Sequence, residues 1–213
     1  MVFGQLSSRE SLRDLLVVIQ AHKDKTYHLG LGRSISISNL SKANENRSYL
    51  NFEEFSNHLI TVARQKSIPI DFEIKGKIYA FDSTTIDLCL SLFWWAHFRK
   101  TKAGIKLHTL FDITTQIPAF IHFSEVDVHD INVMDYIVYE PFAYYIFDRA
   151  YIDYKRLFEI TNKRAFFVVR AKLNLKFNRM YSKKVDKSTG VKCDQTGKLT
   201  GFYAAKDYHE KIR

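Results

Sequence analysis

Apolar residues recur at helical spacing in the first third of the chain. Between residues 12 and 19 they lie three or four positions apart, as in a helix that buries one face, at Leu12, Leu15, Leu16 and Ile19. The pattern returns over residues 52–62. Capping boxes at residues 7–10 and 51–54 predict where these two helices begin, with Ser7 as the first N-cap, and a shorter helix is expected over residues 36–46.

The period changes to that of β-structure after Pro69. Apolar runs, alternating or continuous, predict five strands, at residues 74–81, 104–112, 118–126, 144–147 and 166–169. The first three are expected to form an antiparallel meander, and helices are expected over residues 130–139 and 151–161. The continuous apolar run at 144–147 is typical of a strand that is buried on both faces.

These elements predict an α/β fold in which a mixed five-stranded sheet with flanking helices follows a small helical N-terminal domain. We expect the helical domain over residues 1–68, in partial form, and the sheet domain over 72–181. Residues 182–213 are lysine-rich at first and end without a helix stop signal, so they are interpreted as the incomplete start of an inserted β-region. Both ends of the chain are expected to be truncated.

The composition narrows the class of protein. The net charge of +9 favours a polyanionic partner such as nucleic acid, because lysine and arginine that neutralise phosphates release counterions; an ordinary basic protein is the alternative. The chain has two cysteines, Cys89 and Cys193, which make neither a disulfide framework nor a zinc motif. Together with the absence of a secretory signal or a long apolar run, this predicts a cytoplasmic protein without a membrane span.

Two aspartates stand directly after apolar strands. Asp82 follows the run 79–81, and Asp148 follows the run 145–147. Carboxylates at the carboxyl ends of neighbouring strands point into the crevice where α/β sheets bind ligands. Two close carboxylates repel each other unless a cation neutralises them, and Mg²⁺ or Mn²⁺ suits such hard oxygen ligands. The alternative is that each aspartate only caps the turn that follows it.

Three strings in order carry a resemblance to a known family: Tyr-Ala-Phe-Asp-Ser-Thr-Thr-Ile-Asp-Leu at 79–88, Gly-Ile-Lys-Leu-His-Thr-Leu-Phe-Asp at 104–112 and Tyr-Ile-Phe-Asp-Arg-Ala-Tyr at 145–151. The chain resembles, over nearly its whole length, DDE transposases of the insertion-sequence-four type. The resemblance implies a ribonuclease-H-like core in which Asp82 and Asp148 are the first two catalytic acids and ligands of two Mg²⁺ or Mn²⁺ ions. It also implies cleavage and strand transfer of double-stranded DNA, at inverted repeats and target, by a homodimer. A bacterial, nucleoid-associated protein is the setting that the resemblance implies.

The sequence departs from that family at the third acid, a glutamate within a Tyr-x-x-Arg-x-x-x-Glu motif. Neither the segment 154–159 nor Glu210 has the required spacing, so the glutamate is expected after Arg213. Two of three acids should hold metal weakly, which leaves the activity of the chain itself open. The alternatives are a catalytically inactive DNA-binding remnant that inhibits the full-length transposase, and a hydrolytic nuclease of the same fold.

Cations near the two aspartates are candidates for DNA contacts, which fix register without reading sequence. They are Arg99, Lys100, Lys102, Lys106 and Arg149. The first four could instead be lysines and arginines that guard a solvated hairpin edge. Trp94 and Trp95 are expected in the core rather than stacked on a base, and His108 is expected to be a hydrogen-bonded core histidine. The helical segment is interpreted as a bundle with a basic face, with a DNA-tracking helix-turn-helix as the alternative.

Overall fold

The computed structural model describes the chain except for residues 1–3, 5, 33, 71, 89–96 and 100–101. The contacts divide it into two compact units, Met1–Thr61 and Val62–Arg213, and the division lies inside helix α5 (Leu50–Lys66). None of the described helices is long and apolar enough to cross a membrane.

The first unit is helical, as the apolar spacing predicts. It contains α2 (Leu12–Ala21), α3 (Lys23–Thr26), α4 (Ile37–Asn46) and the greater part of α5. The Ser36 side chain accepts a hydrogen bond from the Asn39 amide, which places the start of α4 where the sequence predicts it. The predicted N-cap at Ser7 is wrong, because Ser11 caps α2 by accepting from the Asp14 amide.

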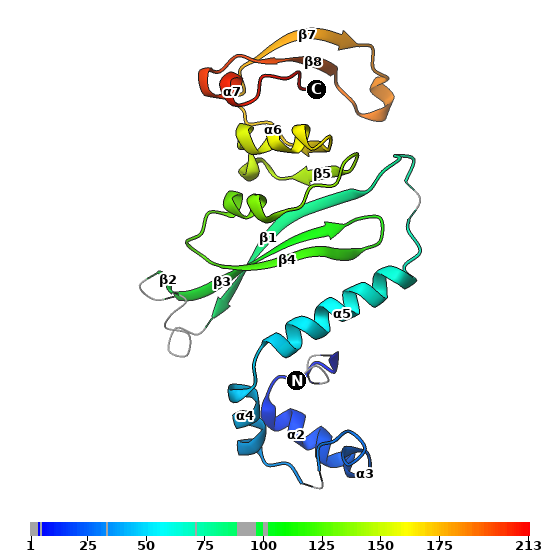
Figure 1. The fold of residues 1–213 in the computed structure, drawn as a ribbon, viewed down its shortest axis with the longest axis vertical. Helices are drawn as coiled ribbons and strands as arrows, with labels where there is room; N and C mark the ends of the chain where they lie inside the picture. Colours follow the sequence, from blue (N-terminus) through cyan, green and yellow to red (C-terminus); the bar gives the residue numbers. More distant parts are fainter. Residues whose placement is uncertain (1–3, 5, 33, 71, 89–96, 100–101) are drawn as a thin grey trace. The chain divides into compact units, whose positions relative to one another are not determined.

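The second unit is built on a mixed sheet (Figure 1). Its strands are β1 (Ile78–Leu88), β2 (His97–Arg99), β3 (Lys102–Asp112), β4 (Ile117–Glu125), β5 (Tyr144–Phe147) and β6 (Phe166–Val169). The order is β2-β3-β1-β5-β6, with β4 also paired to β3. β1, β3 and β4 are antiparallel neighbours, whereas β5 and β6 run parallel to β1. This is the predicted five-stranded ribonuclease-H-like arrangement with the three-residue β2 added.

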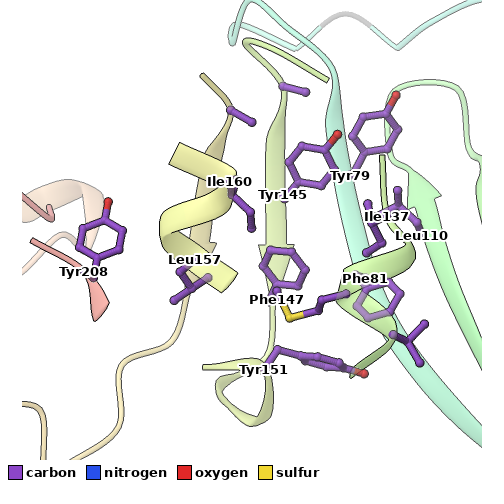
Figure 2. Close-up of a cluster of buried hydrophobic side chains, with 14 of the residues drawn as sticks. Tyr79, Phe81, Leu110, Ile137, Tyr145, Phe147, Tyr151, Leu157, Ile160 and Tyr208 are labelled. Carbon is purple, nitrogen blue, oxygen red and sulfur yellow. The ribbon is translucent and has the colours of Figure 1, made fainter. Parts of the chain in front are cut away.

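One face of the sheet carries the hydrophobic core. Tyr79 and Phe81 of β1 lie beside Tyr145 and Phe147 of β5, and all four side chains are buried. Two elements cover them: the 3₁₀ helix η1 (Asp130–Tyr136), which supplies Val133 and Met134, and helix α6 (Tyr154–Asn162), which supplies Leu157 and Ile160. Figure 2 shows the rings and the aliphatic side chains interleaved between β1, β5 and α6. The helix expected over 130–139 is therefore shorter and more tightly wound than predicted.

The opposite face of β5 and β6 is left open by the part of the chain that the structure describes. Side chains alternate along a strand, and in β5 the buried Tyr145 and Phe147 alternate with Ile146, which is 36% exposed. Val168 of β6 pairs with Ile146 in register and is 54% exposed. The prediction that residues 144–147 are buried on both faces is therefore wrong for the described chain, since η1 and α6 pack on one side of the sheet.

The C-terminal region forms a two-stranded antiparallel sheet, β7 (Phe177–Lys183) with β8 (Asp194–Leu199), followed by the short helix α7 (Phe202–Asp207). Tyr208 is buried and packs edge-on against Phe158 of α6 and Phe167 of β6. Arg213 binds both carboxylate oxygens of Asp194 at 2.7 and 2.8 Å. Whether this hairpin begins an inserted β-region stays a prediction.

Candidate functional site

The site lies where β1 and β5 stop pairing. The last pair in their parallel register is Phe81 with Phe147, and the next residue on each strand is an acid, Asp82 or Asp148. Neighbouring strands are about 4.8 Å apart, so the two acids lie side by side where this pairing ends. Both keep extended backbone, and both are exposed. The structure therefore brings together the two aspartates that the sequence singles out.

Asp82 does not end its strand, contrary to the sequence prediction. β1 continues to Leu88 while pairing with β3, and only its pairing with β5 stops at Phe81. One edge of β1 is thus free of β5 from Asp82 onward. The Asp82 Oδ1 accepts a hydrogen bond of 2.8 Å from the Ser83 amide, which holds the carboxylate beside its own backbone.

Asp148 stands at the junction between β5 and the single-turn 3₁₀ helix η2 (Arg149–Tyr151). Its carbonyl oxygen accepts a 3.0 Å hydrogen bond from the Tyr151 amide, so the turn begins directly at the acid. Strand alternation places Asp82 on the same face as Ala80, and Asp148 on the same face as Ile146. This is the uncovered face, so both carboxylates are open to a ligand from that side.

A layer of polar side chains lies on the opposite, covered face near the acids. The ammonium of Lys106 is 2.9 Å from the Asp130 carboxylate and donates a 2.7 Å hydrogen bond to the Val128 carbonyl. His108 is fully buried, and its Nε2 is 2.8 Å from the hydroxyl of Ser124. Burial lowers the pKa of His108, which keeps the ring neutral at pH 7. The expectation of a hydrogen-bonded core histidine is confirmed by this geometry.

The predicted cations are differently placed. Arg149 is exposed and lines an open hollow of about 610 Å³ together with Asp148, Lys172 and Asn174. The side chain of Lys106 is only 15% exposed and is already paired with Asp130. Arg99 and Lys102 belong to β2 and β3, but nothing of their side chains is described. The remaining predicted residues of this region, Lys100, Trp94 and Trp95, lie outside the described residues.

Lys172 and Asn174 are the residues that sequence reasoning missed. They follow β6, the parallel neighbour of β5, and share the hollow with Asp148. The carboxyl ends of parallel strands meet at one edge of a sheet. A polar or basic residue soon after the 166–169 run was therefore the signal by which Lys172 and Asn174 could have been found.

The donor set suits a hard divalent cation but is small. Asp82 and Asp148 offer carboxylate oxygens on one open face, the ligand type that Mg²⁺ and Mn²⁺ prefer. Among the described residues, no group of three or more histidine, cysteine, aspartate or glutamate side chains is arranged to hold a metal ion. Asp130 does not complete the pair, because it is bound to Lys106. The geometry thus provides two acidic ligands.

Comparison with known proteins agrees with this geometry. Residues 73–213 match the family described as Transposase DDE domain, and residues 1–32 match a domain of unknown function, DUF4372. A protein of Sinorhizobium fredii (strain NBRC 101917 / NGR234), named "Putative transposase y4zB", is 32% identical over 103 residues, which are 48% of this chain. The matched residues span only 29% of that relative's length. No solved structure matches the chain.

The family match covers the whole sheet unit from β1 onward, including both aspartates and the hairpin β7–β8. The resemblance to the insertion-sequence-four type is not distinguished by these matches and stays a prediction. A divalent metal and DNA are the general requirements of this family's chemistry, in keeping with a carboxylate pair in a chain of net charge +9. The chain belongs to the Transposase DDE domain family.

Proposed function

We propose that this chain carries two of the acids with which a transposase cleaves DNA and transfers its strands in the presence of Mg²⁺ or Mn²⁺. The observation that supports the proposal is the register of β1 and β5, in which Asp82 and Asp148 follow the same pair of residues, Phe81 and Phe147. Neither carboxylate serves as a turn cap: Asp82 lies inside a strand that continues for six more residues, and the Asp148 side chain makes no cap hydrogen bond to η2.

Asp82 and Asp148 would hold the metal through their carboxylates on the uncovered face of the sheet. The bound ions would supply activation of the attacking water or 3′-hydroxyl and charge stabilisation on the leaving oxygen of a phosphodiester. The protein's contribution is to hold both carboxylates adjacent and open on one side. The hydrogen bond from the Ser83 amide to Asp82 and the turn that begins at Asp148 limit the directions that the two side chains explore.

DNA would approach along the hollow beside Asp148. Arg149 and Lys172 bring two positive charges to it, and Asn174 brings an amide that can donate to a phosphate oxygen. We keep Arg99, Lys100 and Lys102 as proposed phosphate contacts. Lys106 is left out of this set, since its ammonium is occupied by Asp130 and the Val128 carbonyl.

The number of acids governs what the isolated chain can do. The family pattern uses a third acid, a glutamate, and the described residues place no third free carboxylate beside Asp82 and Asp148. The 213-residue chain is therefore expected to bind metal weakly and to bind DNA through its cations. A homodimer that assembles on inverted repeats is part of the same proposal.

The catalytic test uses the gene product as it is encoded at its genomic locus, with DNA that spans the flanks of that locus. Mn²⁺-dependent strand cleavage and joining of pre-cut ends are expected, and both should be abolished by Asp82→Asn or Asp148→Asn. The matched control is Asp87→Asn, an exposed aspartate on the same strand. Cleavage that survives Asp82→Asn would exclude this site. Cleavage without joining would indicate a nuclease, and DNA binding without either would indicate an inactive remnant.

A further inference from the structure

Tyr151 lies directly beneath the two acid-bearing segments. Its ring is 5.2 Å from that of Phe81, the residue before Asp82, and 6.2 Å from that of Phe147, the residue before Asp148. The rings of Phe81 and Phe147 are themselves 6.1 Å apart. Figure 2 shows Tyr151 at the end of the buried cluster, below both phenylalanines. The three rings form a closed triangle in which each ring contacts the other two.

The geometry of the triangle is specific. Phe81 meets Tyr151 edge-on at 67° and Phe147 edge-on at 70°, the arrangement in which the positive edge of one ring faces the negative face of another. Tyr151 is 2% exposed, so the contacts are shielded from water. A shift of either strand end would have to break at least one of these contacts, because interiors packed at this density do not deform freely.

Tyr151 is also tied to Asp148 through the backbone. Its amide closes the turn that begins at the Asp148 carbonyl, with a 3.0 Å hydrogen bond. Burial raises the pKa of its hydroxyl to about 12; the Ser83 side chain lowers it, and the carboxylates of Asp130, Asp82 and Asp148 raise it. The hydroxyl is therefore neutral at working pH and adds no negative charge beside the acid pair.

We infer that Tyr151 is the positioning residue that sets the separation of Asp82 and Asp148, by holding the residue before each acid against one ring. The inference rests on the proposed function, because it assumes that the two carboxylates share metal. A purely structural tyrosine would support the stability of the sheet unit without affecting how the acids bind an ion. A positioning tyrosine should affect metal affinity beyond any effect on stability.

The test measures Mn²⁺ binding to the 213-residue chain by electron paramagnetic resonance, together with thermal unfolding. Tyr151→Leu removes the ring, Tyr151→Met fills similar space without a flat ring, and Tyr151→Phe keeps the ring and removes only the hydroxyl. Tyr208→Leu is the matched control, since Tyr208 is a buried tyrosine of the same core. Its ring packs edge-on against Phe158 and Phe167, and its hydroxyl lies 3.1 Å from that of Thr161, all away from the two acids in sequence.

We expect Tyr151→Leu and Tyr151→Met to weaken Mn²⁺ binding about tenfold, a change of about 1.4 kcal/mol. Tyr151→Phe should keep wild-type affinity, and Tyr208→Leu should lower the unfolding temperature without changing affinity. Wild-type affinity in a folded Tyr151→Met or Tyr151→Leu protein would overturn the inference, and so would an equal loss of affinity in Tyr208→Leu. Asp82→Asn separates two ways in which the inference could fail. If Tyr151 variants and Asp82→Asn all bind Mn²⁺ like the wild type, the proposed metal site is refuted. If Asp82→Asn loses Mn²⁺ binding while the Tyr151 variants keep it, only the positioning role of Tyr151 is refuted.

Discussion

Lys106 and Asp130 form an ion pair of 2.9 Å that links β3 to the start of η1. This pair favours a structural role for Lys106 over a contact with DNA. The two side chains are 15% and 30% exposed, so each charge is partly removed from water and depends on the other. From the sequence, in which Asp130 is not seen to lie beside it, the same lysine is predicted to contact DNA.

Lys106→Met is expected to lower the free energy of unfolding by about 2 kcal/mol, because it leaves the Asp130 carboxylate and the Val128 carbonyl without their donor. Urea unfolding measures this loss, and Lys106→Met combined with Asp130→Asn should recover part of it. The salt dependence of DNA binding should stay unchanged. A variant of wild-type stability that has lost DNA affinity would return Lys106 to the DNA contacts.

Arg149 and Lys172 are expected to contact phosphates from the hollow beside Asp148. Each alanine substitution should reduce the slope of log affinity against log salt by about 1, for any DNA sequence. Lys163→Ala is the matched control, because Lys163 is exposed and precedes β6 at the end of the strand far from Asp148. Titrations of duplex DNA at several salt concentrations give the slopes. Equal slopes in wild type and both hollow variants would remove this hollow from the DNA path.

Arg156 links α6 to η1 through ion pairs and hydrogen bonds. Its guanidinium binds both Asp135 oxygens at 2.7 Å, Asp153 at 3.1 Å and Asn132 at 3.3 Å. The hydrogen bond from Arg156 lowers the pKa of Asp135. A carboxyl with a lowered folded pKa stabilises the fold above its unfolded pKa, about 3.9, and this contribution disappears as pH falls through the folded value.

Arg156→Ala should therefore cost about 1 kcal/mol of stability at pH 7, since Asp135 is half exposed and solvent screens the pair. The difference between variant and wild type should shrink below about pH 3.9, as Asp135 becomes protonated in both. Arg156→Lys should recover only part of the loss, because an ammonium cannot bind the carboxylate in two places. Thermal unfolding across that pH range measures the effect, and a difference that does not change with pH would contradict it.

His108 should give a second dependence of stability on pH, which arises from burial of the ring and not from an ion pair. Burial lowers its pKa, so the unfolded chain takes up a proton at a higher pH than the folded chain does. Stability should fall as pH decreases below about 6.5, the ordinary histidine value, until the folded pKa is reached. His108→Asn, which keeps a polar partner for Ser124, should lose less stability than the wild type between pH 7.5 and 5.5. Equal losses in urea unfolding would show that His108 is not the titrating group.

The sheet was predictable because its strands have strong patterns. The runs at 144–147 and 166–169 coincide with β5 and β6, since apolar β-formers bounded by polar residues leave little choice of register. The continuation of β1 beyond Asp82 was not predictable in the same way. Residues 83–87 are mostly polar, and they extend because β3 pairs with them, although the paired residues lie 17 to 25 positions farther along the chain.

The two acids of the candidate site could be predicted from the sequence, but the residues that surround them could not. Asp82 and Asp148 follow apolar runs, and this local signal was sufficient to find them. That Asp130 would pair with Lys106, or that Lys172 would share a hollow with Asp148, depends on which loops meet at the edge of the sheet. The spacing of single residues along the chain does not determine such meetings.

The proposed metal site requires that Asp82 and Asp148 bind the same ion or ion pair together. Mn²⁺ titration of the 213-residue chain, followed by electron paramagnetic resonance, tests this most directly. Asp82→Asn and Asp148→Asn should each weaken binding at least tenfold, the double variant should be little worse than either single one, and Asp87→Asn should bind like the wild type. Unchanged Mn²⁺ binding in either single variant, in a protein that stays folded, would contradict a shared site.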